Sequence, residues 1–217
     1  MLRPSEIVFA LSGLSFPNTF NPYSDRCSVY DKADAPSRRR AMLLGILNAA
    51  SKSEVDSIWV GRDLGYRGGR RTGLALTDDV HIDLHARRWN VAMCRPTKGE
   101  AVAERTAAVI WSALDRIEET IFLWNVFPLH PHEADQPFSN RGHNAQERAA
   151  GEEILAELIR LLSPKRIVAI GNDAASSVAR VSKSVETIQV RHPSYGGQNE
   201  FLAQIRTLYR LRSDLLL

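Results

Sequence analysis

The sequence predicts an α/β fold, a three-layer α/β/α sandwich around a central, mainly parallel four-stranded sheet. Short apolar segments alternate with longer segments of helical spacing, a pattern typical of parallel sheets covered by helices. The segments 121–124 and 166–170 are almost wholly apolar, as expected of strands buried on both faces. A chain of 217 residues suits one full core. We therefore expect one domain over residues 1–217, with residues 1–35 wrapping around it.

Each element follows from local spacing. The expected strands are 57–60, 121–124, 166–170 and 185–190. The expected helices are 37–52, 100–117, 145–162, a small-residue helix after Asn172, and 198–211. Asn144 and Glu147 have the spacing of a capping box, and Ser163-Pro164 ends that helix. The first 30 residues have the aromatics and turn formers of a loop, and 78–84 fits a short strand or a turn.

Composition excludes several classes of protein. A charged fraction of 24% and an apolar fraction of 44% exclude wholesale disorder. Cys27 and Cys94 are too few for a disulfide framework or a four-thiolate site, so we expect free thiols and neither a metal nor a cofactor. His130, His132 and His143 have no cysteine or carboxylate at metal-ligand spacing. No apolar run approaches the roughly 20 residues of a membrane span, and 7–14 lacks a signal-peptide cleavage site. A cytoplasmic protein in a reducing compartment is the expectation.

The charge is unevenly distributed although the net charge is only +3. The glycine-rich stretch 61–75 holds four arginines against one aspartate, a composition that favours phosphate contacts. The run Arg38 to Arg40 more simply indicates a solvated helix face. The tryptophans Trp59, Trp111 and Trp124 are expected in the core rather than as base-stacking platforms.

Polar side chains follow three of the expected strands. Asp63 comes after the first strand, Asn125 after the second and His192 after the last. Because the carboxyl ends of parallel strands share one edge of the sheet, a carboxylate, a carboxamide and an imidazole are expected to converge there. Each also has a structural alternative: Asp63 as an N-cap or Asx-turn residue, Asn125 as the closure of a buried turn, and His192 as a hydrogen-bonded structural histidine.

At these residues the sequence resembles the uracil-DNA glycosylase superfamily. Residues 61–65, with the trailing 73–76, look like the family's water-activating loop, and 192–194 look like its DNA-clamping loop. The order and spacing of the two segments, with Asn125 at the end of an intervening strand, carry the resemblance. The family's iron–sulfur branches need four cysteines, so this chain looks like a divergent, cluster-free branch.

The resemblance implies a role for each matching residue. Asp63 would stabilise the sugar cation and orient water, His192 would donate to uracil O2, and Asn125 would read N3–H and O4. Leu76 falls where the family has a stacking phenylalanine, and Gly65 where it has a thymine-excluding tyrosine. The uracil-binding set is completed by Gly61, Arg62 and Tyr66. The DNA contacts implied are Arg67, Arg70, Arg71, Pro193, Ser194, Tyr195, Gly196 and Gln198, with Tyr195 or Gln198 in place of the family's leucine wedge.

The expected function is a monomeric DNA repair enzyme that flips uracil out of single- or double-stranded DNA and hydrolyses its N-glycosidic bond. Free uracil and an abasic site would be its products. One alternative is a catalytically weak uracil-DNA binding protein of the same fold, since Gly65 and Leu76 depart from the family. Another is a nucleotide-binding protein using 61–69 as a phosphate cradle, although the glycine spacing fits neither a dinucleotide fingerprint nor a P-loop.

Overall fold

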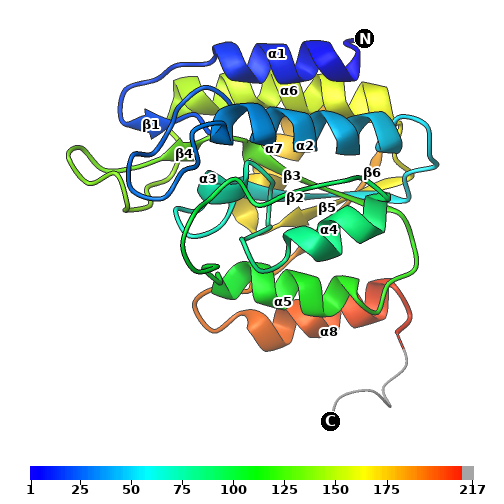
Figure 1. The fold of residues 1–217 in the computed structure, drawn as a ribbon. Helices are drawn as coiled ribbons and strands as arrows, with labels where there is room; N and C mark the ends of the chain where they lie inside the picture. The colour runs from blue at the N-terminus through cyan, green and yellow to red at the C-terminus, as the bar shows by residue number, and fades with distance from the viewer. Residues whose placement is uncertain (212–217) are drawn as a thin grey trace.

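The computed structural model describes residues 1–211 and shows a central sheet with helices on both faces (Figure 1). The sheet has four parallel strands in the order β3-β2-β5-β6. They are β2 (Ser57–Asp63), β3 (Ile121–Phe127), β5 (Arg166–Ile170) and β6 (Glu186–Val190). The predicted three-layer α/β/α sandwich is confirmed. Residues 212–217 of the expected domain lie outside the described residues.

The strand order determines where a ligand can approach. The chain runs from β2 to β3 on one side, then crosses back to β5 on the other side of β2. This change of direction at β2 is a topological switch point, where the connections leave the sheet on opposite faces. The carboxyl end of β2, which is Asp63, therefore lies where open α/β sheets usually bind their ligands.

Two hydrophobic clusters, one on each face, hold the layers together. The first face is covered by α2 (Ala35–Ala50), α6 (Ala145–Leu162) and α7 (Asn172–Val181), and α1 (Pro4–Gly13) packs outside on α2 and α6. The second face is covered by α5 (Arg105–Leu114) and α8 (Gln198–Leu208). Short elements complete the fold: β1 (Thr19–Phe20) paired with β4 (His130–Pro131), α3 (Gly69–Thr72), and α4 (Ile82–Trp89), which packs against α2.

Helix α6 approaches the sheet unusually closely. A Cβ atom at Gly151 would lie 2.1 Å from the backbone oxygen of Val126 in β3. No other residue type fits there unless the helix moves, because the obstacle is backbone rather than a flexible side chain. At its N-terminus, the Asn144 side chain accepts hydrogen bonds from the amides of Gln146 and Glu147, so the predicted capping box is confirmed.

The structure corrects the description of the first 30 residues as loop. Residues 4–13 form α1, with Pro4 in the first turn and Ile7, Val8 and Leu11 buried. The segment 78–84 is a turn followed by the start of α4. Strands β2 and β3 run three residues further than 57–60 and 121–124, while the helix expected over 100–117 is limited to α5.

Several core predictions are confirmed and one is wrong. Trp59, Trp111 and Trp124 are buried, and Cys27 and Cys94 are free thiols. Arg39, predicted on a solvated face, is instead fully buried, because Asp31 neutralises its guanidinium and the Arg71 carbonyl accepts from its Nε.

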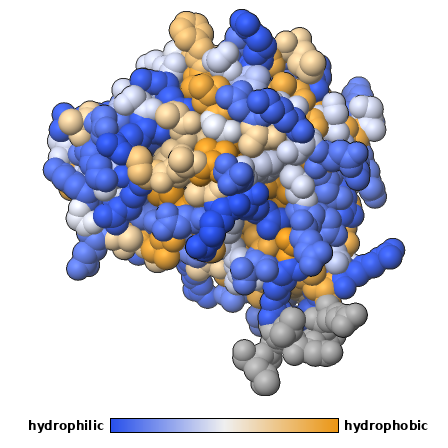
Figure 2. Space-filling view, turned by 45° about the vertical axis from the view of Figure 1, so that its right-hand side comes forward, coloured by the Kyte–Doolittle hydropathy of each residue, from blue (hydrophilic) through white to orange (hydrophobic). Residues whose placement is uncertain are grey.

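Hydrophilic residues dominate the face seen in Figure 2, with smaller groups of hydrophobic residues between them. No helix among residues 1–211 has the length and apolar character to cross a bilayer.

Candidate functional site

Neighbouring strands bring the predicted carboxylate and carboxamide to one edge of the sheet. Gly61 of β2 lies opposite Asn125 of β3, and Asp63 lies opposite Phe127. His192 follows the end of β6, where a Cβ atom at Gly171, just after β5, would lie 3.3 Å from the His192 Cβ. The three elements that carry Asp63, Asn125 and His192 therefore meet at the carboxyl edge, as the parallel strands predict.

Asn125 is almost fully buried, and its Oδ1 has no hydrogen-bond partner among residues 1–211. A Cβ atom at Gly61 would lie 2.5 Å from that oxygen and 3.1 Å from a Leu76 methyl, so a side chain at position 61 would fill the space in front of the amide. Leu76 is held by a hydrogen bond from the Trp111 indole to its backbone oxygen. An unpaired amide oxygen in a buried place is costly, typically about 1–3 kcal/mol, unless a ligand satisfies it.

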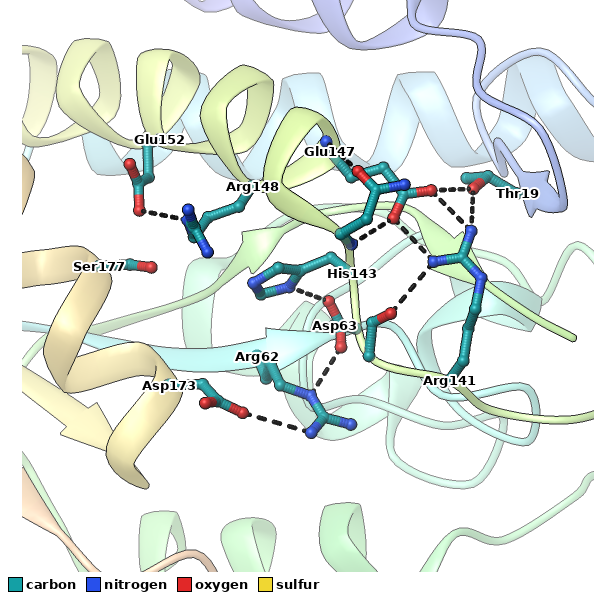
Figure 3. A network of polar contacts seen from close by, with 12 residues as sticks. Thr19, Arg62, Asp63, Arg141, His143, Glu147, Arg148, Glu152, Asp173 and Ser177 are labelled. Atoms are coloured by element: carbon teal, nitrogen blue, oxygen red, sulfur yellow. Dashed lines mark hydrogen bonds and ion pairs between the residues drawn. The ribbon is translucent and has the colours of Figure 1, made fainter.

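The Asp63 carboxylate receives two hydrogen bonds (Figure 3). The His143 Nδ1 contacts Oδ1 at 2.5 Å, and the Arg62 Nε donates to Oδ2 at 2.7 Å. Arg62 also forms an ion pair with Asp173 at 3.3 Å, and this pair connects the end of β2 to the start of α7. The side chains of Asp63 and His143 are only 6% and 7% exposed, so the carboxylate is shielded and held by groups from two different segments.

No sequence pattern predicts the contact between His143 and Asp63. His143 precedes the N-cap of α6 and lies 80 positions away in the chain, and only the fold brings the two together. The three histidines considered as metal ligands do different things: the His130 ring contacts Arg70, and His132 bonds the Glu133 carbonyl.

The local bonding of His192 fixes which ring nitrogen carries the proton. The Ser194 backbone N–H donates to Nδ1 at 3.1 Å, so Nδ1 is the acceptor and the hydrogen of the neutral ring is on Nε2. Burial lowers the pKa of His192, and the nearby cations Arg62 and Arg191 lower it further. The imidazole is therefore neutral at pH 7 with an N–H available from Nε2.

The segment after β2, residues 64–76, is called the β2 loop here. Its Arg70 and Arg71, predicted to contact DNA phosphates, are buried, and their guanidinium groups are bound inside the protein. Arg70 donates to the Tyr30 hydroxyl at 2.7 Å and lies over the Phe20 ring, and Arg71 pairs with Asp79 at 2.7 Å. These contacts use the guanidinium groups to hold the loop against the body of the protein.

The outer part of the β2 loop stays accessible. Arg67 is exposed and donates to the Tyr66 hydroxyl, and the Tyr66 amide donates to Asn140. A Cβ atom on Gly65 would lie 3.5 Å from Glu104 Oε1. The space where the family has a tyrosine is therefore bordered by the Glu104 carboxyl group, which no sequence pattern predicts. Burial raises the pKa of Glu104 to about 7, and the Asp78 carboxylate adds to the shift.

The segment after β6, residues 191–197, is called the β6 loop. It carries Pro193, Ser194, Tyr195 and Gly196, and Gln198 begins α8 directly after it. Tyr195 is 98% exposed and has a positive φ of 51°, which turns its ring out of the loop. Of the two residues considered as a wedge, Tyr195 is therefore the more exposed, since Gln198 is partly buried.

Comparison with known proteins identifies the family. The model of the uracil DNA glycosylase superfamily matches residues 54–211. The crystal structure of wild-type SMUG2 from Pedobacter heparinus is similar, with a TM-score of 0.61 and 14% sequence identity over 97% of this chain and 98% of that chain. No curated protein matches the chain. The family supports a DNA glycosylase function in general. The chain belongs to the uracil DNA glycosylase superfamily.

Proposed function

We propose that the protein is a uracil-DNA glycosylase, a monofunctional hydrolase that releases uracil from DNA and leaves an abasic site. The general glycosylase function follows from the family. The choice of uracil rests on one observation, the buried and unpaired Oδ1 of Asn125 facing the space in front of Gly61. A carboxamide accepts from uracil N3–H and donates to O4. Cytosine has the opposite donor and acceptor at those positions and would leave the amide unpaired.

The chemistry requires charge stabilisation at two places. When the bond between C1′ and N1 breaks, its electron pair leaves with the uracil and the sugar becomes an oxocarbenium-like cation. Asp63 stabilises that cation and orients the water whose oxygen bonds to C1′, and the carboxylate takes the water's proton. The Nε2–H of His192 donates to uracil O2 as negative charge develops there. The neutral tautomer fixed by Ser194 suits this role.

The target nucleotide must leave the duplex to reach this buried edge. Ser194 and Gly196 contact the backbone beside it, next to the buried Pro193, and the exposed ring of Tyr195 fills the vacated position in the stack. Arg67 and Tyr66 offer further DNA contacts on the opposite border of the site. Because every proposed group comes from one chain, the proposed reaction needs neither a second subunit nor a cofactor.

A strand-scission assay tests this proposal. Labelled oligonucleotides carrying uracil, hypoxanthine, thymine opposite guanine, or cytosine are incubated with enzyme and then with alkali, in single- and double-stranded form. We expect scission at uracil and none at cytosine, with D63N as the inactive control that still binds DNA. A gel shift on uracil DNA without scission would instead support the weak-binding alternative. Scission at hypoxanthine alone would move the specificity to a purine.

A further inference from the structure

We propose that His143 is a positioning residue that holds the Asp63 carboxylate in its reactive orientation. The inference rests on the proposed function, because it assigns the support of the carboxylate used there. The Asp63 oxygens are acceptors only, so the 2.5 Å contact requires the hydrogen on the His143 Nδ1. Arg62 binds the other oxygen from the opposite side. Two donors on two oxygens fix the rotation of the carboxylate plane, which a single donor would leave free.

The two donors differ in how firmly they are held. The Arg62 side chain is 46% exposed and shared with Asp173, which is itself 61% exposed. His143 is 7% exposed and packs edge-on against the Phe127 ring, with centroids 6.3 Å apart. Arg62 can thus leave Asp63 when a DNA phosphate approaches, while His143 stays in place. Of the two, His143 is the support that persists through the reaction.

The segment that carries His143 is fixed on both sides (Figure 3). Before it, Arg141 donates to both Glu147 oxygens at 2.7 Å and to the His132 carbonyl at 2.9 Å. After it, Asn144 caps α6 and its amide donates to Glu147 at 2.7 Å. The carboxylate of the capping box thus holds the residues on either side of His143. The imidazole is ordered before any substrate arrives, so its support requires little reorganisation during the reaction.

The test compares three variants in single-turnover uracil release, with DNA affinity and melting temperature measured in parallel. H143A removes the donor, and we expect the rate to fall on the order of 10- to 100-fold with DNA affinity unchanged. H143N places an amide N–H near the position of Nδ1 and should recover most of the rate. H132A is the matched control, since His132 lies in the same segment and does not contact Asp63 among the described residues.

A double mutant separates positioning from general destabilisation. If His143 acts through Asp63, H143A should change the residual rate of D63N by less than twofold. Full activity in H143A, or an equal loss in H143A and H143N with both variants folded, would overturn the inference and leave the proposed function intact. A further large loss in the D63N background would also overturn it. If the wild-type protein releases no uracil, the proposed function fails and the inference fails with it.

Discussion

The β2 loop and the β6 loop border the same site but are built in opposite ways. The β2 loop is tied to the protein interior through Arg70 and Arg71, which are buried among aromatic rings and an aspartate. The β6 loop holds the His192 ring through Ser194 and leaves Tyr195 in solvent. The β2 loop beside Asp63 is therefore preorganised, whereas the β6 loop beside His192 leaves the Tyr195 side chain free to contact a ligand.

The largest expected effect is on the stability of the β2 loop. R71A leaves Asp79 buried without its partner, since the two side chains are 8% and 0% exposed. Loss of one partner of a buried ion pair typically costs about 3–5 kcal/mol, and we expect that decrease in the free energy of unfolding in urea. The exposed Arg67 is the control: R67A should stay within about 0.5 kcal/mol of wild type. Normal stability in R71A together with weak DNA binding would reverse the assignment of Arg71.

The next effect is on catalysis, at the start of the β6 loop. H192A removes the Nε2–H donor, and we expect single-turnover uracil release to fall about 10²- to 10³-fold, as for one oxyanion-hole donor. The pKa of His192 is lowered, so the wild-type rate should not change above neutral pH through this group. In acid, protonated Nδ1 can no longer accept from the Ser194 amide, and the rate should fall because the ring loses the bond that orients it. A wild-type rate in H192A would remove His192 from the mechanism.

A smaller effect is expected at the tip of the β6 loop. Y195A should weaken binding to uracil DNA by about 1–3 kcal/mol, the usual contribution of one aromatic–base contact. The melting temperature should not change, because the side chain is 98% exposed. Y195F should bind like wild type, since the ring rather than the hydroxyl fills the stack. Equal affinity of Y195A and wild type in fluorescence anisotropy would place the wedge elsewhere.

The last expected effect depends on pH and concerns Glu104 beside the β2 loop. In the unfolded chain Glu104 has the ordinary carboxyl pKa of 4.5, whereas in the folded protein its pKa is about 7. The protonated Glu104 therefore contributes to the free energy of unfolding in full below pH 4.5, and this contribution is lost as the pH rises through 7. E104Q should therefore melt progressively higher than wild type from pH 4.5 to 7.5. A pH-independent difference, or the same trend in E100Q at an exposed site, would contradict this.

Sequence patterns predicted the elements whose signals are local. The capping box of α6, the four strands and the convergence of their polar ends follow from periodicity and from the geometry of parallel sheets. Helix α1 was missed because the turn formers after it suggested loop for the whole segment, although Ile7, Val8 and Leu11 have helical spacing. The sequence does not reveal whether an arginine faces solvent or an aromatic ring, so the burial of Arg70 and Arg71 could not be predicted.

The contacts between distant segments could not be predicted. His143 meets Asp63, and Glu104 borders Gly65, because α6 and α5 bring them to the edge of the sheet from opposite faces. Neither residue has a spacing relationship to the β2 loop that a single sequence displays. Site residues at the end of a strand could therefore be predicted from the sequence. Site residues next to the start of a helix could not.

The close contact of α6 with β3 at Gly151 sets a distance that side chains do not control. A side chain at position 151 would meet the Val126 backbone, so Asn125, the residue proposed to read uracil, and His143, which precedes the helix, are held at a fixed separation. Substitutions among the hydrophobic side chains between α6 and the sheet would therefore leave the distance between α6 and β3 unchanged. A methyl group added at Gly151 would push α6 away from β3 and would change the distance between the proposed uracil-reading Asn125 and the proposed positioning residue His143.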